Sequence, residues 1–128
     1  MANTSNKPKK IKSQVPGRIY SWLIEQSKAQ GIKRVSRSIA RLVAQATREN
    51  IEFSNKEKLD SAEAYKAHTA CHFVADNSLL VSYESLKKLN GIDVDAQMVR
   101  LIVKRYYDIA KGKTFYIEKI SKQSTFWD

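Results

Sequence analysis

The stretch Lys10-Ile-Lys-Ser-Gln-Val15 decides the fold of the first half of this chain. Its side chains alternate, and this period of two predicts a β-strand over residues 10–15. One face of that strand would carry Ile11, Ser13 and Val15, and the other would carry Lys10, Lys12 and Gln14. Pro16 ends the strand, because proline lacks the N–H that a sheet needs and fits the first turn of a helix.

Two helices are predicted after this strand. The first runs from about Gly17 to Gln30, and Gly31 stops it. Its core positions recur every four residues, at Ile19, Leu23 and Ser27. Ser36 is the expected N-cap of the second helix, which reaches about Asn50. Its apolar positions have helical spacing: Ile39, Leu42, Val43 and Ala46.

The remaining residues also read as mainly helical. Ser54 and Glu57 have the spacing of a capping box, which predicts a helix reaching roughly Val74. Further helices are expected over residues 83–89 and 95–110, and residues 114–120 favour a strand. No internal repeat is visible. We expect a flexible basic arm (1–9), a DNA-binding domain (10–53) and a mostly helical C-terminal domain (54–128) for oligomerisation or partner binding.

Positive charge is concentrated at the amino-terminal end. The chain of 128 residues has a formal net charge of +10. Residues 1–53 hold eleven Lys or Arg and three Glu, a balance of +8, whereas residues 54–128 have a balance of only +2. A local positive field of this kind favours a polyanion such as nucleic acid, because bound phosphates release condensed counterions.

Composition also narrows the class of protein. The single cysteine, Cys71, cannot support an internal disulfide framework, and we expect a cytoplasmic protein. The sequence has neither an apolar run long enough to span a membrane nor a secretory signal, so no membrane association is expected. No cofactor or metal site is expected.

A lone strand needs a hydrogen-bonding neighbour, and fifty residues are too few for a stable monomeric core. The economical solution is a homodimer, and a higher oligomer can build on it. Two copies of residues 10–15 would pair antiparallel, with four helices beneath them. The dimer core would contain Ile11, Val15, Ile19, Leu23, Ile39, Leu42 and Val43.

The segment from Ile11 to Gly31, followed by Val35 to Val43, resembles the ribbon-helix-helix (MetJ/Arc-type) family of DNA-binding proteins. The resemblance covers about 40 of the 128 residues and rests on an ordered set of features. These are the strand ending in Val15-Pro16, the core spacing of both helices, Gly31 and Ser36. The chain departs from the family at Ser13, where an apolar strand residue is usual. The fold implied is mainly α, an intertwined ribbon-helix-helix dimer with a helical C-terminal extension.

The resemblance also implies roles for individual residues. Lys10, Lys12 and Gln14 match the strand positions that read bases in the major groove, where lysine suits guanine and glutamine suits adenine. Ser36 matches the start of the second helix, which holds a phosphate on its free N–H groups. The expected DNA backbone contacts are Lys7, Lys9, Arg18, Lys33, Arg34, Ser36 and Arg37.

Sequence-specific binding of double-stranded DNA is therefore expected, by a transcriptional repressor or a plasmid transfer or maintenance accessory protein. In the main alternative, the protein is an antitoxin whose residues 54–128 neutralise a toxin partner. A non-specific RNA or single-stranded DNA binder would need exposed aromatic residues among the basic ones. Only Tyr20 and Trp22 lie between Lys7 and Arg48, both on a predicted helix.

Catalysis and metal binding have weaker support. On a helix, His68, His72 and Asp76 would share one face, with Cys71 nearby, and zinc accepts such ligands. No second cluster of ligands accompanies them. Catalysis by Cys71 would need a base held across the fold rather than on the same helix. We expect neither a metal site nor an enzyme.

Overall fold

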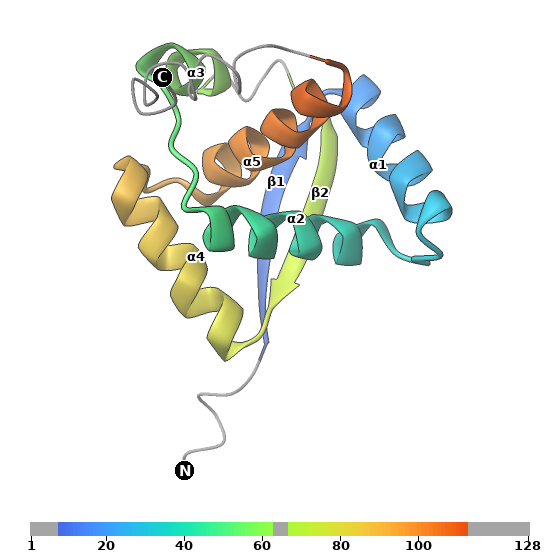
Figure 1. Cartoon of the computed structure of the whole chain (residues 1–128), viewed down its shortest axis with the longest axis horizontal. Helices are drawn as coiled ribbons and strands as arrows, with labels where there is room; N and C mark the ends of the chain where they lie inside the picture. Colours follow the sequence, from blue (N-terminus) through green and yellow to red (C-terminus); the bar gives the residue numbers. More distant parts are fainter. Residues whose placement is uncertain (1–7, 63–66, 113–128) are drawn as a thin grey trace, which may run out of the picture.

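A two-stranded ribbon and five helices make up the described part of the chain (Figure 1). The structure, a computed structural model, describes residues 8–62 and 67–112. In chain order its elements are β1 (Lys9–Val15), α1 (Gly17–Ala29), α2 (Val35–Glu49), α3 (Asn55–Ser61), β2 (Thr69–Ala75), α4 (Asn77–Asn90) and α5 (Asp95–Ala110).

The partner of β1 is β2 of the same chain. The two strands pair antiparallel, with Lys9 opposite Ala75 and Val15 opposite Thr69. The prediction that residues 10–15 pair with a copy of themselves from a second chain is therefore wrong. A second chain is not needed to satisfy the backbone of β1, because the other half of the sequence supplies a strand of equal length.

The second strand lies where one long helix was predicted. The capping box is confirmed, since Ser54 Oγ accepts from Glu57 N and the Glu57 carboxylate accepts from Ser54 N. The helix it opens ends at Ser61, however, and does not reach Val74. Residues 69–75 instead alternate between buried and exposed, with Cys71, Phe73 and Ala75 inside. That period of two places them on a sheet.

The strand over residues 10–15 and the helices over 17–30, 36–50 and 95–110 are confirmed within one or two residues at each end. Ser36 is not the N-cap of α2, because Arg34 takes that position. The helix α4 is longer than the predicted residues 83–89, since Asp76 caps it by accepting from Leu79 N at 2.8 Å. The predicted strand over 114–120 lies outside the described residues.

The chain contains an internal structural repeat. An offset of 60 residues relates β1 to β2, α1 to α4 and α2 to α5: the paired elements begin at equivalent positions, and each helix of the second repeat ends one residue later. The two inter-helix turns obey the same offset, since Gly31 and Gly91 have φ values of 71° and 65°. This left-handed conformation favours glycine. The expectation of no repeat is therefore wrong.

Both halves share one apolar core beneath the ribbon. The inward residues of β1 and β2 pack against helices of the opposite repeat, so α5 lies on β1 and α2 lies on β2 (Figure 1). The predicted core residues are buried inside one chain: Ile11, Val15, Ile19, Leu23, Ile39 and Val43, with Leu42 partly buried beside them. The expected C-terminal domain contributes residues such as Phe73, Tyr83, Val99 and Val103 to this core.

Polar anchors fix α5 under β1. Ser13, buried among apolar side chains, donates its hydroxyl to Ala96 O at 2.6 Å. Arg100 is also buried, and its Nε donates to Gln14 O at 2.8 Å. A serine at the position where an apolar residue is usual therefore has a hydrogen-bond partner, which removes the cost of burying its hydroxyl.

Candidate nucleic-acid interface

The outer face of the ribbon brings together the three residues predicted to read bases. Lys10, Lys12 and Gln14 are exposed, because the residues between them, Ile11, Ser13 and Val15, are buried beneath the ribbon. The helices α5 and α2 pack against β1 and β2 on the buried side of the ribbon. The backbone beneath this row is held in place, because every residue of β1 from Lys9 to Val15 is paired with a residue of β2.

Sequence reasoning missed the other row of this face. Ala70, His72 and Val74 of β2 lie opposite Gln14, Lys12 and Lys10, in that order. Ala70 and Val74 are exposed, and His72 is partly exposed. The signal that could have found them is the alternation of buried residues at 71, 73 and 75, which the capping box upstream obscured.

Most of the predicted backbone-contacting residues are exposed, at the ends of β1 and at the start of α2. Lys9 begins β1, and Arg18 lies in the first turn of α1, just after β1 ends. Lys33, Arg34 and Arg37 are exposed at the start of α2, where Ser36 is half-buried. In Figure 1 this helix begins to the right of the ribbon, whereas α5 begins to its left. Lys7 lies outside the described residues.

The starts of the two flanking helices differ in charge. The first turn of α2 has no acidic residue, and its N-cap, Arg34, is extended. The first turn of α5 carries Asp95, which accepts from Tyr83 Oη and Lys87 Nζ, both at 2.8 Å. Burial opposes ionisation of Asp95, but these hydrogen bonds outweigh it and lower its pKa. A carboxylate therefore already occupies the positive end of α5.

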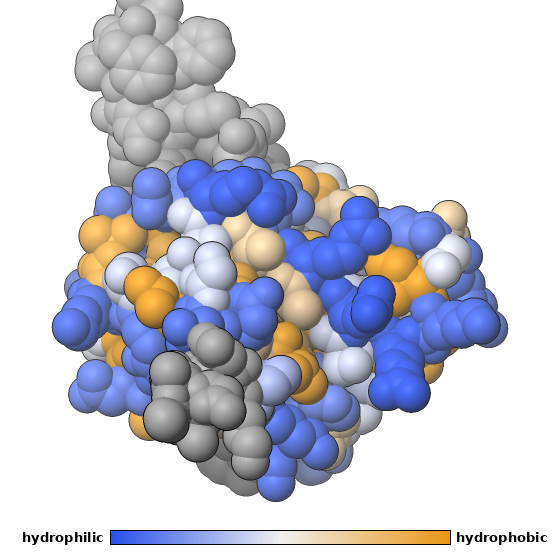
Figure 2. Space-filling view, turned by 90° about the horizontal axis from the view of Figure 1, so that it is seen from below, coloured by the Kyte–Doolittle hydropathy of each residue, from blue (hydrophilic) through white to orange (hydrophobic). Residues whose placement is uncertain are grey.

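The whole first repeat is much more basic than the second. Residues 9–50 contain ten Lys or Arg and two Glu, a balance of +8. The equivalent residues 69–110 contain five basic and five acidic residues, a balance of zero. Figure 2 views the molecule from the end where β1 begins, and hydrophilic residues cover most of that face, with hydrophobic ones scattered among them.

The side chains proposed as alternative metal ligands diverge. Cys71 is buried under the ribbon, whereas His72 lies on the outer face, because successive residues of a strand point to opposite sides. Within residues 8–62 and 67–112, no three His, Cys, Asp or Glu side chains are placed to hold a metal ion. Burial raises the pKa of the Cys71 thiol to about 11, which disfavours the nucleophilic thiolate.

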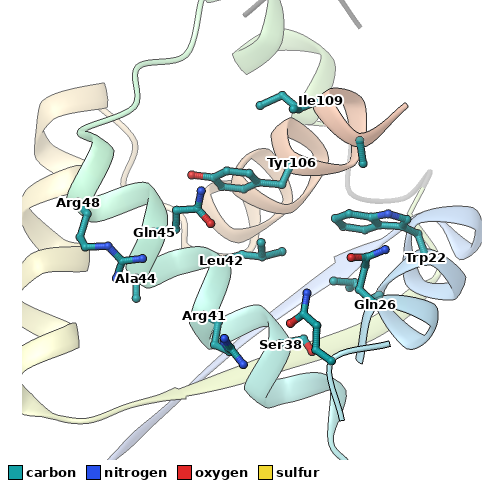
Figure 3. A pocket seen from close by; sticks show the side chains of 13 residues that line it. Trp22, Gln26, Ser38, Arg41, Leu42, Ala44, Gln45, Arg48, Tyr106 and Ile109 are labelled. Carbon is teal, nitrogen blue, oxygen red and sulfur yellow. The ribbon is translucent and has the colours of Figure 1, made fainter. Parts of the chain in front are cut away.

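A shallow groove of about 530 Å³ lies between α1, α2 and α5 (Figure 3). Trp22 and Gln26 line it from α1, Arg41 and Arg48 line it from α2, and Tyr106 lines it from α5. The Tyr106 hydroxyl donates to Glu49 Oε1 at 2.9 Å, and burial followed by this contact raises its pKa. The phenol therefore stays protonated, and it serves to join α5 to the end of α2.

Among the described residues, none of the helices combines the length and the apolar character needed to cross a bilayer. No protein-family model, curated protein or solved structure matches the chain. The candidate interface therefore rests on the geometry and charge described above.

Proposed function

We propose that this protein binds double-stranded DNA sequence-specifically by inserting its β1–β2 ribbon into the major groove. In this proposal the chain is a single-chain form of the ribbon-helix-helix module, with each repeat in the place of one subunit. A two-stranded ribbon fits the major groove, which is about 12 Å wide. The outer face would meet the base edges, while the inner face stays on the core.

The observation that carries the proposal is the exposed row of Lys10, Lys12 and Gln14 on a ribbon whose opposite face is buried against the core. The lysines have the donors needed for guanine O6 and N7, and the amide of Gln14 has a donor for adenine N7 and an acceptor for adenine N6. All three side chains are exposed, so they contribute nothing to the core of the protein and are accessible to a ligand. The +8 balance of the same repeat adds the attraction for phosphates that non-specific binding requires.

Backbone contacts would come from the flanks of the ribbon. Arg34 and Arg37, with Ser36 between them, stand at the start of α2, where free N–H groups and the helix dipole favour an anion. Lys9 and Arg18 stand near opposite ends of β1. Such contacts set the register of the protein on the duplex, while the strand residues discriminate between sequences.

The biological role consistent with this binding is transcriptional repression or an accessory role in plasmid transfer or maintenance. The antitoxin alternative, in which residues 54–128 neutralise a toxin, has less support, because β2, α4 and α5 pair with or pack on the first repeat. A second copy of the chain is not required to form the ribbon. Dimerisation, if it occurs, is therefore not needed to build the proposed DNA-binding surface.

The test is binding of the full-length chain to duplexes selected from a random pool, measured by fluorescence anisotropy. Changing Lys10, Lys12 and Gln14 together to Ala should abolish the preference for the selected duplex over a scrambled one. The matched control changes Lys28, Lys88 and Gln30 to Ala, which removes the same charge from exposed positions at the ends of α1 and α4. Equal preference in the ribbon variant and the control would contradict the proposal.

A further inference from the structure

The two rows on the outer face of the ribbon have different chemistry. The β1 row consists of Lys10, Lys12 and Gln14, all hydrogen-bonding side chains, while the β2 row contains Ala70 and Val74 on either side of His72. We infer that the duplex recognised is non-palindromic and is bound in one orientation, with β1 hydrogen-bonding to base edges and with Val74 and Ala70 contacting thymine methyl groups. This inference rests on the proposed DNA binding.

The internal repeat makes the asymmetry explicit. A ribbon of two identical strands would present the same residue at positions related by the two-fold axis. Here the 60-residue offset relates Lys10 to Ala70 and Gln14 to Val74. The cross-strand register then gives the ribbon two unlike ends, one with Lys10 beside Val74 and the other with Gln14 beside Ala70. Inverted half-sites cannot match both ends equally.

The side chains indicate what each end would read. Lysine suits a guanine and glutamine suits an adenine, whereas small apolar side chains make contact with the C5 methyl group of thymine. Val74 is 45 % exposed in the free protein, so its methyl groups are still partly hydrated. Packing against a thymine methyl group would displace the remaining water, which is a favourable transfer for apolar surface.

The flanks fix the same orientation independently. At the start of α2, Arg34 and Arg37 can approach a phosphate. The equivalent turn of α5 has Val94 and Gln97 at those two places and carries Asp95 between them. Asp95 and the neighbouring Asp93 would repel a phosphate there, although Lys87 offsets part of this charge. One flank of the ribbon therefore attracts the DNA backbone much more strongly than the other.

The first part of the test is the selection itself, with the full-length chain and a random duplex pool. The expected consensus lacks inverted symmetry and contains thymines on the side read by β2. A palindromic consensus would leave DNA binding intact and overturn the asymmetric recognition. Failure to enrich any duplex would overturn both the proposed function and the inference, so the two failures are distinguishable.

The second part replaces individual thymines of the selected duplex with uracil, which lacks only the C5 methyl group. Wild-type protein should bind about four-fold more weakly when uracil replaces the thymine that Val74 contacts, as expected for one buried methyl group. Val74→Ser should bind the thymine duplex more weakly and should no longer respond to uracil. Val81→Ser, at a 63 % exposed position on α4, is the matched control and should keep the response. Equal uracil sensitivity in Val74→Ser and wild type would overturn the inference.

Discussion

Lys12 of β1 lies directly opposite His72 of β2, at the centre of the ribbon. The 60-residue offset makes these two residues equivalent, so the pair lies on the axis that relates the two repeats. Burial lowers the pKa of His72 from its usual 6.5, and the charges of Lys10 and Lys12 lower it further. The imidazole is therefore neutral at pH 7, with one donor and one acceptor on the outer face.

This lowered pKa predicts how stability depends on pH. Below about pH 6.5 the unfolded chain binds a proton at His72 more readily than the folded chain does, so acidification favours unfolding. The decrease in stability should begin as the pH falls through 6.5 and should level off below the folded pKa. Urea unfolding between pH 8 and pH 5 should show it. His72→Gln should be less destabilised over this range than His68→Gln, an exposed control just before β2.

DNA affinity should have the opposite pH dependence. The phosphates of a bound duplex favour the protonated imidazole, so affinity should rise as the pH falls below about 6.5. Anisotropy titrations with wild type and His72→Gln at several pH values would measure this. A wild-type affinity that is flat between pH 8 and pH 5.5 would show that His72 does not face the DNA.

Gln14 should specify a single base pair. Its amide is exposed, although its Oε1 lies 3.4 Å from Arg100 Nη2, a contact that orients the side chain. Gln14→Ala should relax discrimination at one position by about 1–3 kcal/mol. Competition among four duplexes that differ at that base pair would reveal the change. Gln30→Ala, at the exposed end of α1, should leave the discrimination as it is.

Arg34 and Arg37 should act on all sequences alike. Changing both to Ala should weaken binding to selected and scrambled duplexes equally and should flatten the dependence of log affinity on log salt. The slope should fall by about 0.9 for each phosphate that the variant no longer neutralises. Changing Arg41 and Arg48 of the same helix removes the same charge from the groove of Figure 3. An equal decrease of slope in this control would contradict a specific role for the start of α2.

Asn90 should be important for stability. It is buried at the end of α4, where its Oδ1 accepts from Phe53 N at 2.8 Å and its Nδ2 donates to Ile51 O at 3.0 Å. Asn90→Ala would leave both backbone groups without these partners, at a cost of about 2–4 kcal/mol. Urea unfolding should show this decrease in stability, whereas Asn77→Ala, at an exposed position on the same helix, should change little.

The sequence predicted the first repeat well because its signals are local. Alternation over residues 10–15, Pro16 and Gly31 each act within a few residues. The exposure of Lys10, Lys12 and Gln14 followed from the same alternation. The pairing partner of β1 could not be inferred in this way, because it depends on contacts across 60 residues.

The repeat could not be seen in the sequence because the two halves have the same arrangement of elements but few identical residues. Between residues 9–50 and 69–110, only four positions are identical, at Lys28, Gly31, Ile32 and Val43 of the first repeat. At the core positions Leu23 is replaced by Tyr83, and Ser13 is replaced by Phe73. The exposed positions diverge further, as with Lys10 and Ala70, and this divergence generates the unlike rows of the ribbon.

The ribbon formed within one chain can be tested with a single substitution. Ser13 lies opposite Cys71, and both face the core, so Ser13→Cys places two thiols on directly opposed residues. Opposed residues of antiparallel strands have Cα separations that a disulfide can span. Copper-catalysed oxidation of Ser13→Cys, followed by non-reducing electrophoresis and mass spectrometry, should give a monomer with a disulfide between residues 13 and 71 that still binds the selected duplex. A covalent dimer joined through residue 13 of two chains would contradict the account.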